Sequence, residues 1–99
     1  MTKIKNLADE LNEELESAKN YAEEYLSFKA ANNTTWANRY KEMAQEELKH
    51  AGYIHDRVVV EIEDLRKVYT PPQDMMEKWD ADHKRYIEKA AWIRQMLAM

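Results

Sequence analysis

The sequence predicts an all-α protein in which three long helices run up and down. Of the 99 residues, 34% are charged and 44% are hydrophobic, with 1 Gly and 2 Pro. That balance is typical of helices and poor in the residues that form β-turns. Apolar residues recur every three or four positions over most of the chain, which is the period of a helix face. Turn-forming residues gather at two places, so the chain divides into three helical segments.

The first helix is predicted from about residue 3 to residue 31, because its apolar residues follow a repeat of threes and fours. These residues are Ile4, Leu7, Leu11, Leu15, Ala18, Ala22 and Tyr25. The run Asn32-Asn33-Thr34-Thr35 ends the helix, since Asn and Thr favour turns and helix caps. Either Asn33 or Thr34 is placed to cap the next helix.

The second helix is predicted from about residue 35 to residue 69. Its inner stripe is Trp36, Tyr40, Met43, Glu47, His50, Ile54, Val58 and Leu65. Thr70-Pro71-Pro72 then ends it, because a helix does not continue through consecutive prolines. Packed against the first helix, the second forms a long antiparallel hairpin.

The third helix is predicted from about residue 72 to residue 98. Its inner stripe is Met76, Trp79, His83, Tyr86, Ile87, Ala90, Ile93 and Leu97. Trp92, Met96 and Met99 lie on the opposite side of this helix, and two apolar faces on one helix imply a further partner. We therefore expect a single domain over residues 1–99, completed by homo-oligomerisation.

Charge and composition exclude several classes of function. The net charge is −4 and no basic stripe is present, which argues against nucleic acid as a partner. The chain has no Cys, so disulfides and thiolate metal sites are excluded. No apolar run is long enough to span a membrane, and acidic residues follow the first six positions where a signal peptide would be apolar. We expect a cytoplasmic protein.

Glu47 and His50 are ionisable residues on the predicted inner stripe, where every other member is apolar or aromatic. Burial of such a pair costs free energy unless a metal ion or a partner charge satisfies it. Three residues apart on a helix, a carboxylate and an imidazole share one face. Folding the first two helices together about Asn33 brings Glu14 to the level of this pair. Two carboxylates and an imidazole suit iron, manganese or zinc.

Glu14, followed by Glu47-Leu48-Lys49-His50 on the next antiparallel helix, resembles one half of a ferritin-like or rubrerythrin-like di-iron carboxylate bundle. Residues 43–51 are similar to the second-helix segment of that family, and the resemblance covers about residues 7–65. It implies iron as the cofactor, Glu14 and Glu47 as carboxylate ligands and His50 as an imidazole ligand. It also implies a role in oxidation, peroxide consumption or iron storage.

The chain departs from that family because it carries one Glu…Glu-x-x-His set, whereas the family uses one from each of two halves. The resemblance therefore implies a homodimer or larger assembly in which chains pool their ligands. Fold does not dictate activity, so the sequence leaves open whether the protein is an enzyme and assigns no catalytic residue.

His83 is a further ionisable residue on an apolar stripe, with Asp80 three positions before it. Folding the third helix back about residue 70 places His83 near Val58 and at the level of Glu61. His83, Asp80 and Glu61 form a secondary candidate metal set, with a structural histidine bonded to a carboxylate as the alternative. His55 points off the predicted stripe and is expected to be solvated.

The main alternative is a metal-free protein. The same folding places Arg94 near Glu47, so Glu14, Glu47, His50 and Arg94 would form a buried salt-bridge network. The protein would then be a helical interaction or regulatory factor, for example a virus-encoded accessory factor, that presents a face such as that of Trp92. A small-molecule-sequestering oligomer is a third possibility, for which the sequence shows no phosphate-cradling loop.

Overall fold

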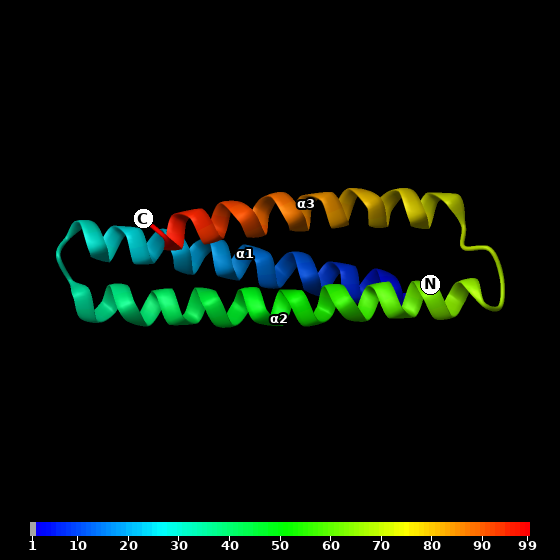
Figure 1. Cartoon of the computed structure of the whole chain (residues 1–99), viewed down its shortest axis with the longest axis horizontal. Coiled ribbons are helices and arrows are strands. Elements are labelled where there is room, and N and C mark those ends of the chain that lie inside the picture. The colour runs from blue at the N-terminus through cyan, green and yellow to red at the C-terminus, as the bar shows by residue number, and fades with distance from the viewer. Residues whose placement is uncertain (1) are drawn as a thin grey trace.

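The computed structural model describes residues 2–99, which form a rod of 55 × 17 × 17 Å built from three helices. They are α1 (Thr2–Ala30), α2 (Thr34–Arg66) and α3 (Gln73–Leu97). In Figure 1, α2 runs antiparallel to α1, and α3 returns along the other side of α1. The described residues contain no strand, so the all-α, three-helix prediction is confirmed.

The turn between α1 and α2 is short and closed by Asn residues. Asn32 has a φ of 59°, a left-handed conformation that Asn tolerates better than most residues. The Asn33 side chain accepts a hydrogen bond of 3.3 Å from the Trp36 N–H, so Asn33 is the N-cap of α2. Only residues 31–33 connect the two helices, and so few residues leave the register of the hairpin little freedom.

The end of α2 differs from the prediction, because the helix stops at Arg66 instead of about residue 69. The Lys67 and Val68 N–H groups bond to the carbonyls of Asp64 and Leu65, three residues back, which tightens the last turn. The two prolines that follow prevent the helix from continuing. Residues 67–72 then form a six-residue connection to α3.

The α1–α2 contact is made by small side chains around a few large ones. Ala18 and Ala22 of α1 and Ala44 and Ala51 of α2 are fully buried, and their size lets the helices lie close together. The buried face of α1 follows the predicted spacing. It consists of Ile4, Ala8, Leu11, Leu15, Ala18, Ala22 and Tyr25. The prediction for this helix is therefore confirmed except at one position, where Ala8 is buried and the predicted Leu7 is only partly buried.

The predicted inner stripe of α2 is only partly right. Val58 is buried as predicted, and Tyr40, Ile54 and Leu65 are partly buried against the core, but the centre of the contact is rotated toward the alanines. The buried residues of α2 are Ala37, Ala44, Leu48, Ala51, Val58 and Ile62. Trp36, which the prediction placed in the stripe, is 50% exposed, and Met43 is also exposed. The close approach of α1 selects alanines for the centre of the contact, so bulky side chains lie at its edge.

The third helix packs along α1 and contacts α2 sparsely, through large side chains that bridge a wider gap. The bridge consists of His55 on α2 and Trp79, His83 and Tyr86 on α3. Met96, predicted on the outer side of α3, is buried, whereas Ile87, predicted inside, is 53% exposed. Although each helix within residues 2–99 is long enough for a bilayer span, none has the apolar stretch that crossing one requires.

Candidate metal site

Glu14, Glu47 and His50 converge on one point of the α1–α2 seam. Each offers a ligand atom, and these atoms all lie within 4.8 Å of one another. The Nδ1 atom of His50 is 3.8 Å from Oε1 of Glu47, one turn away on the same helix. Across residues 2–99, this is the one group of three or more His and acidic residues close enough to share an ion. The sequence-predicted primary set is therefore brought together.

The environment of the group is less buried than predicted. The Glu47 side chain is 24% exposed and that of His50 is 54% exposed. The buried face of α2 is centred on Leu48 and Ala51, so the two side chains lie at its edge beside α1. The expectation that they occupy the core is wrong, so the burial of these two side chains within one chain does not by itself require a compensating cation. A metal site is supported instead by the convergence of three side chains that can bind a metal.

The two carboxylates interact with each other. The pKa of Glu14 is raised above its ordinary value, first by a hydrogen bond with Glu47, then by partial burial and by the negative charge of Glu47. The nearby His50 opposes this shift. Two carboxylates in one place share a proton more readily than they ionise together. A divalent cation would take the place of that proton.

Replacement of Glu14 with Gln should stabilise the metal-free protein at neutral pH. The folded-state pKa of Glu14 lies above the ordinary glutamate value of 4.5, so the unfolded chain ionises first as the pH rises. Stability is therefore lost between pH 4.5 and the folded-state pKa. Glu14→Gln should restore it above that window, by a small amount because solvent screens this partly buried group. Below pH 4.5 the gain should vanish. Thermal unfolding against pH, after treatment with a chelator, measures this dependence.

The exposed neighbour Glu13 provides the control for this substitution. Glu13→Gln also removes one negative charge from α1, but Glu13 does not belong to the Glu14/Glu47 pair. This substitution should therefore leave stability nearly unchanged. A Glu14→Gln protein that is less stable than the parent at neutral pH would show that the two carboxylates do not repel each other.

The metal-free network predicted around Arg94 does not form. Arg94 makes no ion pair with Glu14 or Glu47 in the described part of the chain, and it lies beside a hollow between α2 and α3. The secondary set of His83, Asp80 and Glu61 is not assembled either. Glu61 pairs with Lys3 at 3.0 Å and with Arg57 at 3.7 Å, while Asp80 is exposed.

His83 instead meets His55, because α3 lies about one helical turn away from the predicted register. The Nδ1 atom of His83 is 2.8 Å from Nε2 of His55. The His55 ring stacks on Tyr86 with a centroid distance of 4.6 Å, and its Nδ1 atom is 3.2 Å from Asp56. The expectation that His55 is solvated is wrong. His55 lies four residues after Ala51 and seven before Ile62, and residues at these spacings share one face of a helix. His55 therefore lies on the same face as these two buried residues.

Asp82 is a buried charge that the sequence analysis did not single out. It is 3% exposed, and its carboxylate accepts hydrogen bonds from Lys78 at 2.7 Å, Arg85 at 2.8 Å and Asn12 at 3.4 Å. Burial alone would raise the pKa of Asp82, but the hydrogen bonds from Lys78, Asn12 and Arg85 together hold it below the ordinary value. The sequence did contain one sign of this burial: Asp82 follows Trp79, a member of the predicted inner stripe, by three residues and so lies on the same side of α3.

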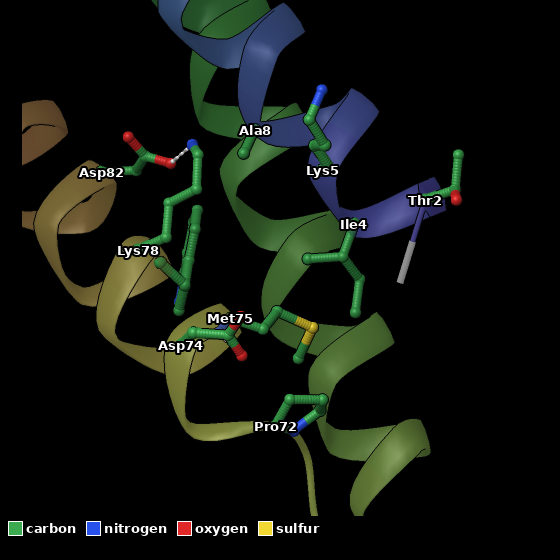
Figure 2. Close-up of a pocket in the computed structure, with 10 residues that line it drawn as sticks. Thr2, Ile4, Lys5, Ala8, Pro72, Asp74, Met75, Lys78 and Asp82 are labelled. Atoms are coloured by element: carbon green, nitrogen blue, oxygen red, sulfur yellow. Dashed lines mark hydrogen bonds and ion pairs between the residues drawn. The ribbon is translucent and has the colours of Figure 1, made fainter.

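A cavity of about 400 Å³ opens beside Asp82, between the first turns of α1 and α3 (Figure 2). Its apolar lining includes Ile4, Ala8 and Met75. Two of the cations along it already have carboxylate partners, since Lys78 pairs with Asp82 and Lys5 pairs with Asp9 outside the cavity. The carboxylate of Asp74, at the first turn of α3, also lines the cavity and accepts a hydrogen bond from the Met75 N–H. A single carboxylate beside an apolar lining does not identify a ligand.

Comparison with known proteins supplies no family for this chain. No protein-family model, curated protein or solved structure matches it. The chemistry of the Glu14, Glu47 and His50 group is therefore the main guide to function.

Proposed function

We propose that this chain is a metal-binding helical protein in which Glu14, Glu47 and His50 hold a divalent cation, with iron as the first candidate. One observation carries the proposal: two helices bring three metal-ligating atoms within 4.8 Å of one another. Carboxylate and imidazole ligands together suit iron, manganese and zinc. The resemblance to di-iron carboxylate bundles favours iron, which would supply the redox chemistry for oxidation, peroxide consumption or storage.

The charge state of the group fits such a cation. The raised pKa of Glu14 reflects two carboxylates held together, and a positive ion would remove the repulsion between them. Binding would displace the shared proton, so affinity should increase with pH. Three protein ligands also leave coordination positions for water or for groups from elsewhere.

We further propose that a second copy of the chain covers the group and contributes its own set of ligands. The ferritin-like pattern requires two such sets, and one chain has one. His50 is more than half exposed. The exposed side chains of Trp36 and Met43 lie on the edge of α2 that carries Glu47, and a two-fold partner would bury them.

The proposal predicts that Fe²⁺ stabilises the folded protein. After a chelator has removed bound metal, anaerobic Fe²⁺ at about 100 times its dissociation constant should add about 2.7 kcal/mol to the free energy of unfolding. For a domain of this size, each kcal/mol corresponds to roughly 4–8 °C in melting temperature. The Glu47→Ala/His50→Ala variant should lose this shift. Thermal unfolding, metal analysis and native mass measurement follow binding and assembly together.

The control is Glu46→Ala/Lys49→Ala, a pair with the same spacing on the neighbouring, exposed side of α2. It should keep the Fe²⁺-dependent shift. Absence of a shift with Fe²⁺, Mn²⁺ and Zn²⁺, together with no bound metal in the parent protein, would overturn the metal-binding proposal.

The alternative function is a metal-free helical interaction or regulatory protein. It is favoured by the number of large apolar side chains that the single chain leaves exposed. These are Trp36, Met43, Tyr53, Val60, Val68, Tyr69, Ile87, Trp92 and Met99. Self-association that is unchanged by a chelator and by Glu47→Ala/His50→Ala would support this alternative.

A further inference from the structure

A hollow of about 510 Å³ lies between α2 and α3, and no residue of α1 and none of Glu14, Glu47 and His50 lines it. It is lined by Lys41, Gln45, Leu48, Lys49, Arg94, Leu97 and Ala98. Three of these side chains are cationic, and none is acidic. The concentration of positive charge is local, since the chain as a whole carries a net charge of −4.

The three cations lack the carboxylate partners that most basic residues of the chain have. Eight of the 15 Lys and Arg residues pair with carboxylates in the described structure. They are Lys3, Lys5, Lys19, Arg57, Lys67, Lys78, Arg85 and Lys89. Lys41, Lys49 and Arg94 form no such pair within residues 2–99. The Lys41 ammonium lies 5.6 Å from the centre of the Tyr25 ring, a contact that leaves its charge uncompensated.

From this arrangement we propose that the hollow binds a small polyanion bearing phosphate groups. Two ammonium groups and one guanidinium match a ligand with several negative charges, whereas a monocarboxylate would neutralise only one of them. Arg offers a planar fork that fits phosphate oxygens, and Lys donates as a point charge. The buried side chains of Leu48 and Leu97 provide an apolar floor for the body of the ligand.

The hollow and the proposed metal group share no residue. They are neighbours on α2, since Leu48 and Lys49 of the hollow stand between Glu47 and His50 in the sequence, but they use different side chains. The main-chain oxygen of Met99 is bound by Lys29 of α1 and not by any of the three cations. Polyanion binding therefore does not depend on the metal-binding proposal, and each can fail without the other.

Titration calorimetry with tripolyphosphate at low salt tests the proposal. We expect saturable binding that weakens as salt is added, and weaker binding of inorganic phosphate, which carries fewer charges. The Lys49→Gln/Arg94→Gln variant should bind tripolyphosphate roughly tenfold more weakly or worse, because charge-assisted hydrogen bonds are lost. Glu47→Ala/His50→Ala should bind it as the parent does.

The matched control is Arg66→Gln/Lys84→Gln. It removes the same charge from two exposed cations, one on α2 and one on α3, that have no carboxylate partner in the described residues and lie outside the hollow. This variant should keep its affinity for tripolyphosphate. No saturable binding at millimolar ligand, or an equal loss in both variants, would overturn the proposal. If the double variant unfolds, Arg94→Gln alone decides between these outcomes.

Discussion

Replacing Leu15 with Ala should remove about 2–5 kcal/mol from the free energy of unfolding. Leu15 is 0% exposed on the buried face of α1. The core around it includes the fully buried alanines Ala44 and Ala51 of α2, which have no side-chain freedom with which to fill the space. A single domain of ordinary stability has only about 5–15 kcal/mol in total. Urea denaturation followed by circular dichroism measures the loss.

Ile87→Ala on α3 is the matched control, since Ile87 is also a large aliphatic residue but is half-exposed. Its loss should be below about 0.5 kcal/mol, as for surface substitutions in general. If Leu15→Ala and Ile87→Ala destabilised the protein equally, the buried seam of α1 would not be the centre of the core. Because Leu15 adjoins Glu14, the loss should also weaken Fe²⁺ binding.

The number and type of the elements could be predicted from the sequence because local signals determine them. Asn32-Asn33 and Pro71-Pro72 interrupt helical periodicity at the two places where the structure turns. The buried face of α1 was also predictable, because its apolar residues mark one broad face of the helix. Both features depend on residues near one another in the chain.

The orientation of α2 was not predictable in the same way. Its large apolar side chains and its alanines mark two overlapping stripes, and hydrophobic periodicity favours the bulkier one. The structure buries the alanines because close packing against α1 has no room for Trp36 at the centre of the contact. His55 lies on the alanine stripe, which explains why its burial was missed.

The two candidate metal sets differ because their helices are joined differently. Three residues connect α1 to α2, so the hairpin register is nearly determined and Glu14 was placed correctly opposite Glu47 and His50. Six residues connect α2 to α3, and that longer loop allows a shift of one helical turn. The shift places His83 against His55 instead of beside Glu61. Register across long connections depends on packing that one sequence does not reveal.

Asp82→Ala should destabilise the protein by about 1–3 kcal/mol at neutral pH, mainly through lost charge-assisted hydrogen bonds. The loss should be smaller than for a fully buried ion pair, because Lys78 and Arg85 are half-exposed and can rehydrate when the carboxylate is gone. The Asn12 amide, part-buried against Asp82, would lose its partner. Chemical denaturation at neutral pH measures the difference from the parent.

The pH dependence of this effect has a definite sign. The folded-state pKa of Asp82 lies below the ordinary aspartate value of 3.8, so the folded state retains the ionised carboxylate to lower pH than the unfolded chain does. The stabilisation is fully present above pH 3.8 and is lost as the pH falls through the folded-state pKa. Parent and Asp82→Ala should therefore converge in acid.

Glu16 is the control, because it is also a paired carboxylate but is exposed, and its partner is Lys89 of α3. Comparing the two substitutions distinguishes the effect of burying a carboxylate from the effect of removing its charge. The pKa of Glu16 is also lowered, by the hydrogen bond and the charge of Lys89. Solvent screens this exposed pair, so Glu16→Ala should have a much smaller effect than Asp82→Ala. Equal effects would mean that the attachment of α3 to α1 depends on surface ion pairs in general. A larger effect at Asp82 would show that its buried hydrogen bonds, two from α3 itself and one from Asn12 of α1, contribute more to stability than the exposed ion pair between the two helices.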